Sequence, residues 1–380
     1  MFNKNYIYAV STAVGSSIGV GIFSLPYVAS KSGFFSFVIL IIFLGIVTII
    51  LNLMYGEITL RTTSNGRLVG YCEKYLGKKG KIIATFITLF SLYSSMLAFM
   101  IIGGVFGKAV FSPFLGGSEF SYSIVMFVLI SAGIYIGLKL IGFVEFLMVI
   151  FLFIAIFGII FKGLPIVDMS NLATNNSSQF FFPFGAILFS IGVLSAIPEL
   201  EHIMKKKQEQ IKDVIIIGNI IPIVVYILFV IVVLGITGKE TSEEALHGLS
   251  LSVGNGIVTL GLIFGIFAIA TSFLMLGMSL KETFWYDYHL SEKKSWALTC
   301  IVPLIVFVLG LRDFVTVVNI AGGIAGGFVG ILIIIVFYKA KKMGDTKPSY
   351  SIKVPITISL AMIAIYSAGI ILQIIESFQI

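Results

Sequence analysis

The chain has 380 residues, of which 58% are apolar or aromatic and 11% are charged, and its mean hydropathy is +1.09. A soluble domain carries about 25% charged residues and cannot bury this much apolar surface, so the composition predicts an integral membrane protein. It excludes secreted disulfide scaffolds, nucleic-acid-binding proteins, coiled coils and disordered chains. The two cysteines, Cys72 and Cys300, lie in different segments and indicate neither a disulfide nor a metal site.

Eleven stretches of the sequence are apolar and long enough to cross a bilayer as helices, which takes about 20 residues each. Alternating strand patterns are absent from the sequence, so we predict an all-α fold rather than an outer-membrane barrel. The expected spans lie near residues 6–29, 34–60, 82–107, 122–138, 142–161, 180–201, 212–236, 254–280, 296–310, 313–338 and 354–376.

The basic residues predict the orientation of these spans. With the N-terminus in the cytoplasm, 20 of the 25 Lys and Arg residues fall on the cytoplasmic side. The five outside are Lys31, Lys108, Lys162, Lys239 and Arg312. Because basic loops are retained in the cytoplasm, we predict a multi-pass protein of the cell membrane with its N-terminus inside and its C-terminus outside.

Two of the predicted spans are interrupted by helix-breaking residues. Span 1 carries the segment Gly15–Gly21 and then Pro26, and span 6 carries Gly192–Glu199 with a proline at position 198. Glycine costs about 1 and proline about 3 kcal/mol in a helix interior, and unpaired peptide groups cost several more in hydrocarbon. We therefore expect both breaks to line a cavity or to be buried in protein, with close helix packing as the alternative. The glycines of span 10, within 322–327, have a spacing typical of close packing.

The two breaks lie five spans apart, on spans that run in opposite directions. This arrangement is typical of an inverted repeat of five plus five helices, with the broken helices facing each other at the bilayer midplane. We predict a transporter core at residues 1–338, with repeats at about 6–161 and 180–338. Residues 339–380 would form a cytoplasmic loop and an eleventh helix outside the repeat. The halves show no convincing residue-level similarity, so the placement of the breaks alone supports this division.

At these positions the sequence resembles a known group of proteins. The segment Gly15–Tyr27 resembles the first-helix signature of amino acid permeases in the amino acid/polyamine/organocation superfamily. Phe189–Glu199 is similar to their sixth helix, Ala268–Phe273 to their eighth, and Gly56–Glu57 with Arg61 to their second. The amino acid/auxin and the hydroxy/aromatic amino acid permease branches are the most similar. The resemblance covers spans 1–10 and implies a LeuT-like fold and ion-coupled amino acid uptake.

An amino acid zwitterion presents a carboxylate and an ammonium group to its binding site. Free amides at the start of the outer half of span 1 favour a carboxylate, and Ser17 lies close to them. These amides belong to Gly19, Val20 and Gly21. Free carbonyls would accept from the ammonium group. They lie near Ser16 and Ser17 in span 1 and at Phe189, Ile191 and Gly192 in span 6.

The substrate side chain would lie among spans 3, 6, 8 and 10. The candidates are Thr88, Ser91 and Ser95 on one helical stripe of span 3, Phe189 and Ser195 flanking the span-6 break, Met275 on span 8 and Asn319 on span 10. Ordinary helix packing is the alternative for each polar residue, because Ser and Thr are common at membrane helix interfaces. The midplane lacks an acid or base for a charged side chain, which favours a neutral substrate, aromatic or otherwise apolar.

Thr271 and Ser272 are adjacent hydroxyl residues deep in an apolar span. By resemblance they match a sodium site that links spans 1 and 8. The carbonyls of Gly15, Ile18 and Ala268 would complete the oxygen ligands of a hard cation. The alternative is helix back-bonding, in which each hydroxyl donates to a preceding carbonyl.

The coupling ion is open between Na⁺ and H⁺. In proton-coupled members of the family, a lysine from span 5 can take the place of the sodium ion, and span 5 has no lysine between Lys139 and Lys162. This favours sodium without excluding proton coupling. Glu199, just after the span-6 break, is either a helix-start or gate carboxylate or a proton carrier.

The leading interpretation is a symporter for neutral amino acids that works by alternating access, and the alternative is a non-transporting amino acid receptor on the same fold. We predict no enzyme, because no nucleotide motif, metal cluster or plausible catalytic triad occurs in the sequence. Metal transporters of this fold carry an Asp-Pro-Gly-Asn and a Met-Pro-His break, which are absent here, so we expect no transition metal. We expect no organic cofactor, no nucleic-acid partner, and a monomer or weak oligomer in the lipid bilayer.

Glu57 and Arg61, spaced i and i+4, are expected to pair.

Overall fold

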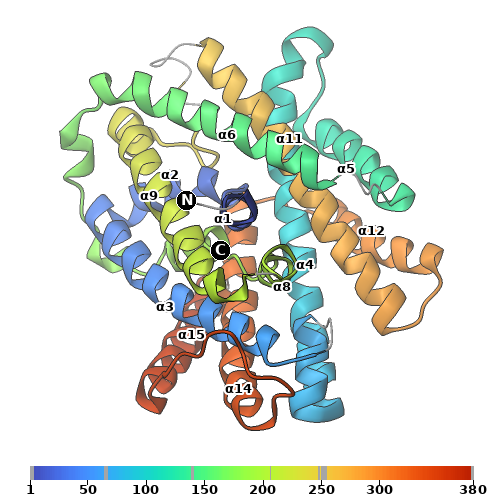
Figure 1. The fold of residues 1–380 in the computed structure, drawn as a ribbon. Helices are drawn as coiled ribbons and strands as arrows, with labels where there is room; N and C mark the ends of the chain where they lie inside the picture. The colour runs from blue at the N-terminus through green and yellow to red at the C-terminus, as the bar shows by residue number, and fades with distance from the viewer. Residues whose placement is uncertain are drawn as a thin grey trace.

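In the computed structural model, the chain folds almost entirely into helices (Figure 1). The structure describes residues 4–63, 67–137, 141–205, 207–246, 249 and 255–377. The first half of the chain forms α1 (Lys4–Ser17), α2 (Gly21–Ser32), α3 (Phe34–Leu60), α4 (Leu68–Leu115), α5 (Glu119–Ile136) and α6 (Ile141–Gly163). The second half forms α7 (Phe184–Ser190), α8 (Ile197–Ile203), α9 (Ile211–Thr237), α11 (Asn255–Glu282), α12 (Glu292–Val308), α13 (Phe314–Asn319), α14 (Gly327–Met343) and α15 (Ile356–Ser377).

The helices confirm a multi-pass, all-α membrane fold. Among the described residues, seven helical segments are long and apolar enough to cross a membrane on their own. The pair α1 and α2 passes the same test as one span bent by 52°. Predicted span 9 falls on α12, which has 17 residues, and predicted span 6 is divided between α7 and α8. The number of eleven spans therefore stays a prediction, as does the division into two repeats.

The outward faces of the helices are apolar. Phe35, Ile39 and Ile46 of α3 and Phe86 of α4 each expose more than half of their side-chain area. A soluble monomer rarely exposes apolar patches larger than a few hundred Å². These faces therefore fit contact with lipid chains, while the polar breaks described below lie inside the bundle.

The helix α4 is longer than the predicted span at 82–107. It starts at Leu68 and bends at Gly77, whose φ of 73° lies in the left-handed region that only glycine adopts without steric cost. The basic residues Lys78, Lys79 and Lys81 follow the bend and break the apolar pattern. This is why the hydropathy pattern predicted only the apolar part of the helix.

The glycines of span 10 allow close helix packing, as predicted. A Cβ on Gly322 would lie 2.6 Å from the amide nitrogen of Phe189, and a Cβ on Gly330 would lie 2.8 Å from the ring of Tyr366. Span 10 therefore packs against α7 and against α15. A π-helical stretch, Ile320–Gly326, joins α13 to α14.

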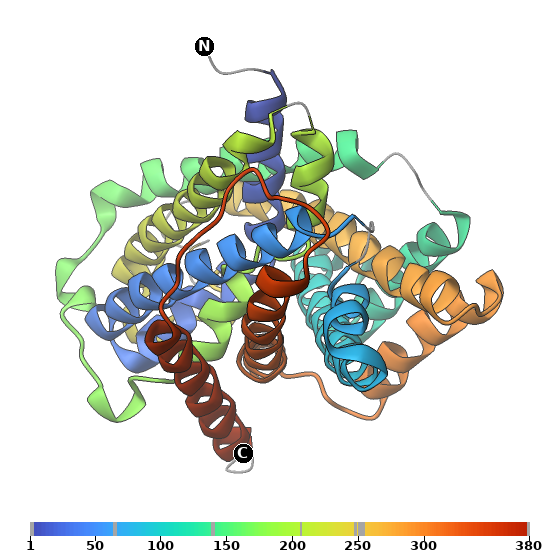
Figure 2. The same ribbon diagram turned by 60° about the horizontal axis from the view of Figure 1, so that its bottom comes forward.

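The connection between α14 and α15 runs across the C-terminal end of α3 (Figure 2). We call residues 344–355 the strap. Hydrogen bonds from the amides of Asp345 and Thr346 to the carbonyl of Arg61 hold its first part, and the hydroxyl of Tyr350 donates to the carbonyl of Leu53 at 2.9 Å. The strap was predicted only as a loop, and the structure shows that it packs on the body of the protein.

Candidate functional site

The first span is broken over Ile18, Gly19 and Val20, between α1 and α2. The amide of Gly19 donates to the carbonyl of Ser17 at 2.9 Å, so the chain turns sharply at the end of α1. Within the described residues, the amides of Val20 and Gly21 donate no hydrogen bond, because they precede the first complete turn of α2. These free amides and the dipole of α2 give this point a partial positive charge that suits a carboxylate.

The sixth span is broken over residues 191–196, between α7 and α8. Ile191 is buried in the core, whereas Ser195 is exposed. Pro198 stands in the first turn of α8, where its missing amide costs little, and Glu199 beside it is exposed. An acidic residue in the first turn complements the helix dipole, which supports the helix-start interpretation of Glu199.

The two breaks meet where α1 and α7 end. The hydroxyl of Ser17 donates to the carbonyl of Ser190 at 3.0 Å. A Cβ on Gly21 would lie 2.8 Å from the Cα of Ser190, so only glycine fits at this approach. The hydroxyl of Tyr226, from α9, lies 2.6 Å from the carbonyl oxygen of Ser17 and 2.9 Å from that of Ser190. We call Ser17, Ser190 and Tyr226 the break cluster.

Tyr226 is not among the site residues predicted from the sequence. A signal was present, because Tyr226 is the lone tyrosine of the predicted span 212–236 and a buried hydroxyl needs a partner. Its hydroxyl also changes the predicted role of the Ser17 carbonyl, which faces two donors, Tyr226 and the amide of Gly19. Both lone pairs of that carbonyl are therefore engaged in this structure. The Ser16 hydroxyl donates within α1, to the carbonyl of Ala13 at 2.9 Å.

Several predicted side-chain residues lie near the span-6 break. Phe189 is half-buried and packs edge-on against Phe99 of α4, with 6.3 Å between ring centroids. Ser95 lies one turn before Phe99 on the same face of α4, and its hydroxyl donates to the carbonyl of Ser91 at 2.9 Å. Both serines are half-buried, as is Met275 on α11. Phe189 and Phe99 thus form an aromatic wall between spans 3 and 6.

Asn319 and Thr88 have different surroundings. The side-chain oxygen of buried Asn319 accepts from the amide of Ala186 at 2.8 Å, which ties α13 to the start of α7. This geometry supports the helix-packing alternative for Asn319. The hydroxyl of Thr88 is buried and has no hydrogen-bond partner within the described part of the chain. An unpaired buried hydroxyl on this stripe is available to a ligand.

The structure places some of the predicted cation ligands near the span-1 break. Ser272 lies beside the span-1 break, because a Cβ on Gly19 would be 3.9 Å from its hydroxyl oxygen. The hydroxyl of Thr271 donates to the carbonyl of Ala268 at 3.0 Å, which is the back-bonding alternative. A back-bonded hydroxyl keeps its lone pairs and can still coordinate a cation. The complete ligand set stays a prediction, and Lys139, used in the sequence argument for sodium, lies outside the described residues.

A polar cavity of about 190 Å³ lies between the end of α3, the start of α4 and the span-6 break. Its lining residues are Thr59, Arg67, Tyr71, Ser195, Pro198, Glu199, Glu201 and His202. The cavity brings together two predicted residues, Ser195 and Glu199. Ligand pockets are typically about 300–1,000 Å³. The volume here is smaller, so this cavity fits a passage to the break better than a complete amino acid pocket.

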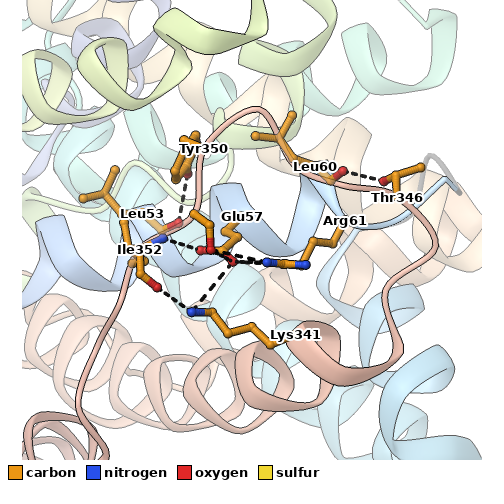
Figure 3. Close-up of polar contacts among 9 residues, drawn as sticks. Leu53, Glu57, Leu60, Arg61, Lys341, Thr346, Tyr350 and Ile352 are labelled. Atoms are coloured by element: carbon orange, nitrogen blue, oxygen red, sulfur yellow. Dashed lines mark hydrogen bonds and ion pairs between the residues drawn. The ribbon is translucent and has the colours of Figure 1, made fainter.

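The predicted pair of Glu57 and Arg61 is confirmed, with 2.8 Å between charged atoms, and it anchors the strap (Figure 3). Glu57 is 0% exposed. Its carboxylate also accepts from the hydroxyl of Ser351 at 2.8 Å and from the amide of Ile352 at 2.7 Å. Lys341 of α14 lies 4.0 Å away. We call Glu57, Arg61, Ser351 and Ile352 the strap cluster.

Comparisons with known proteins agree with this architecture. The chain is 23% identical to tyrosine-specific transport system 1 of Haemophilus influenzae over 355 residues, which cover 88% of each chain. It is 24% identical to glutamine transporter 2 of Aliivibrio fischeri over 322 residues, covering 81% of this chain and 82% of that protein.

Two solved structures share the fold, each at 13% sequence identity. The first is MhsT in complex with L-phenylalanine, with a TM-score of 0.64, covering 97% of this chain and 98% of the MhsT chain. The second is Mhp1, a nucleobase-cation-symport-1 family transporter, with a TM-score of 0.65, covering 97% of this chain and 91% of the Mhp1 chain. The predicted LeuT-like fold is thereby confirmed. The model of the tryptophan/tyrosine permease family matches residues 3–375. The chain therefore belongs to the tryptophan/tyrosine permease family.

Proposed function

We propose that the chain is a symporter that carries a neutral amino acid, with aromatic amino acids as the first candidates, together with a coupling ion. The observation that carries this proposal is the meeting of two broken spans at the free amides of Val20 and Gly21. A zwitterion can be bound there without a buried ionised side chain, by amides at one end and carbonyls at the other. The names of the tyrosine and glutamine transport relatives support an amino acid as the substrate class.

In the proposed binding mode, the amides of Val20 and Gly21 hold the carboxylate. The carbonyls of Phe189, Ile191 and Gly192 accept from the amino group. The carbonyl of Ser17 stands outside this set, because Tyr226 and Gly19 already donate to it. The substrate side chain packs on the wall formed by Phe99 and Phe189, beside Ser91, Ser95 and Met275. An apolar wall with few hydroxyl groups suits an aromatic side chain.

The proposed coupling ion is Na⁺, held by the hydroxyls of Thr271 and Ser272. The carbonyls of Gly15, Ile18 and Ala268 would supply further oxygen ligands, which a hard cation prefers. The position of Ser272 beside the span-1 break supports this site. Proton coupling through Glu199 is the alternative, since that carboxylate is exposed to the polar cavity.

The charge distribution supports insertion in the cell membrane with a cytoplasmic N-terminus. The polar cavity would then open toward the cytoplasm. On the opposite side, Leu246 and Leu249, in the connection before α11, are at most 1% exposed. Alternating access requires the site to open to one side of the membrane at a time.

Uptake into proteoliposomes tests the proposal. Labelled tyrosine, phenylalanine and glutamine are offered under a sodium gradient, under a proton gradient and without either. We expect sodium-driven accumulation of at least one of them. Accumulation driven only by protons would move the coupling role to Glu199, and binding without uptake would point to a receptor.

The cation site is tested by Thr271→Ala and Ser272→Ala. Each removes one hydroxyl ligand, so we expect uptake to lose its sodium dependence. Thr283→Ala is the matched control, because Thr283 lies just beyond α11 and donates to the carbonyl of Ser279 at 2.9 Å, away from the break. Sodium dependence that persists in both site variants would contradict the assignment.

A further inference from the structure

Tyr226 occupies a position between the two broken spans that the binding mode above does not use. Its side chain is 0% exposed, and the two residues that it joins, Ser17 and Ser190, are 5% and 2% exposed. The hydroxyl carries one proton, yet it lies within hydrogen-bond distance of two carbonyl oxygens. The proton is therefore shared between the end of α1 and the end of α7.

The electrostatics of helix ends explains why a donor is needed there. Ser17 is the last residue of α1 and Ser190 the last residue of α7. Both helices therefore point their partially negative C-terminal ends toward the same spot. Two such ends repel each other in a medium of low dielectric constant unless a donor lies between them. Among the described side chains, the hydroxyls of Tyr226 and Ser17 donate to these terminal carbonyls.

We infer that Tyr226 is a positioning residue for amino acid recognition. Its hydroxyl holds the ends of α1 and α7 together and thereby sets the separation between the free amides after α1 and the free carbonyls after α7. The structural part of this inference stands on the hydrogen bonds alone. Its consequence for recognition rests on the proposed function, because it concerns how well an amino acid fits between those groups.

The position of Tyr226 also affects selectivity between ligands with and without an amino group. Tyr226 and Gly19 engage the Ser17 carbonyl, and Tyr226 and the Ser17 hydroxyl engage the Ser190 carbonyl. The amino group must then be read by the remaining carbonyls of the span-6 break, at the distance that Tyr226 sets. Loss of the hydroxyl therefore lowers the preference for a ligand with an amino group over an analogue without one.

The structural part is tested by hydrogen–deuterium exchange of the purified full chain without added amino acid. Tyr226→Phe removes only the hydroxyl. We expect peptides covering 14–22 and 187–197 to exchange roughly three- to tenfold faster, the range that one neutral hydrogen bond is worth. Tyr366→Phe is the matched control, since Tyr366 is 1% exposed on α15 and away from the breaks. Unchanged exchange of both peptides in Tyr226→Phe overturns the inference.

A second variant keeps the test decisive if Tyr226→Phe does not fold. Ser17→Ala removes the other donor to the Ser190 carbonyl and leaves the Tyr226 bridge in place. Because this variant removes one neutral hydrogen bond and keeps the bridge, the break peptides should exchange no more than about three- to tenfold faster than in the parent protein. Full loss of protection in Ser17→Ala would show that Tyr226 does not hold the junction, and would overturn the inference.

The recognition part is tested by binding of L-tyrosine and of 3-(4-hydroxyphenyl)propionate, which lacks the amino group. We expect Tyr226→Phe to reduce the preference for L-tyrosine roughly three- to tenfold, with Tyr366→Phe unchanged. If the break peptides of Tyr226→Phe exchange faster but its preference for L-tyrosine is unchanged, the recognition part is overturned. If the parent protein binds no amino acid, the proposed function fails, while the exchange experiment still decides the structural role of Tyr226.

Discussion

The break cluster and the strap cluster both join segments that are far apart in the sequence, but with opposite chemistry. The hydrogen bonds of the break cluster run from two hydroxyls to two backbone carbonyls, and its three residues carry no ionised side chain. The strap cluster is built around a fully buried carboxylate, Glu57, with a guanidinium, a hydroxyl and an amide as its donors (Figure 3).

The difference follows from what each junction has to do. A neutral hydrogen bond contributes about 0.5–1.5 kcal/mol net, so such contacts can be exchanged for contacts to a substrate at little cost. A buried ion pair that loses one partner costs about 3–5 kcal/mol, so it persists through the motions of the protein. The chain therefore places neutral groups where the proposed site must open, and charged groups where the strap must stay attached to α3.

The largest effect is expected from Glu57→Gln. The substitution keeps the side-chain shape but leaves Arg61 without its counter-charge. Because Arg61 retains 17% exposure, we expect a loss near the lower end of the range for broken buried pairs, about 3 kcal/mol. Thermal unfolding in detergent measures the loss. Glu119→Gln is the control, since its pair with Lys108 is about half exposed and such pairs contribute about 0–1 kcal/mol. Equal losses of stability in the two variants would show that the buried pair of the strap cluster stabilises the protein no more than the exposed pair does.

A smaller effect, centred on the breaks, is expected from Gly21→Ala. The added methyl group would lie 2.8 Å from the Cα of Ser190, so α2 or α7 must shift. Such overpacking costs about 1–3 kcal/mol, and we expect amino acid uptake to fall more than the folded fraction does. Gly158→Ala, at a position with nothing within 4 Å, is the control and should keep full uptake. Normal uptake by Gly21→Ala would show that the close approach of the breaks is not needed for transport.

The sequence predicted the breaks well, because glycine and proline act locally on a helix. It also placed span 2 at 34–60, which matches α3, and span 7 at 212–236, which nearly matches α9. Tyr226 could not be assigned, because its role depends on the rotation of α9 against α1 and α7, and no local pattern encodes that rotation. The pairing of Glu57 with Arg61 followed from their spacing, whereas the bond from the Ile352 amide depends on a fold-back across 295 positions.

The smallest effect concerns Asp345, the second anchor of the strap. Its carboxylate pairs with Lys74 and accepts from the amide and hydroxyl of Thr63, and these contacts lower its pKa to about 2. A lowered pKa means that the stabilisation is complete above the ordinary value of 3.8 and is lost as the pH falls through about 2. Exchange protection of the strap amides, corrected for intrinsic rates, should therefore be constant between about pH 5 and 8.

In Asp345→Asn the same amides should lose protection by a few-fold at every pH between about 5 and 8. The loss should be smaller than in Glu57→Gln, because the Asp345 anchor is exposed to water, which screens its charges. Asp168→Asn is the control, since the Asp168 carboxylate accepts from the amide of Ser170 in a different loop. Protection that falls between pH 8 and 5 in the parent protein but not in Asp345→Asn would mean that Asp345 titrates in this window. The strap would then respond to pH, and its contrast with the break cluster would rest on Glu57 alone.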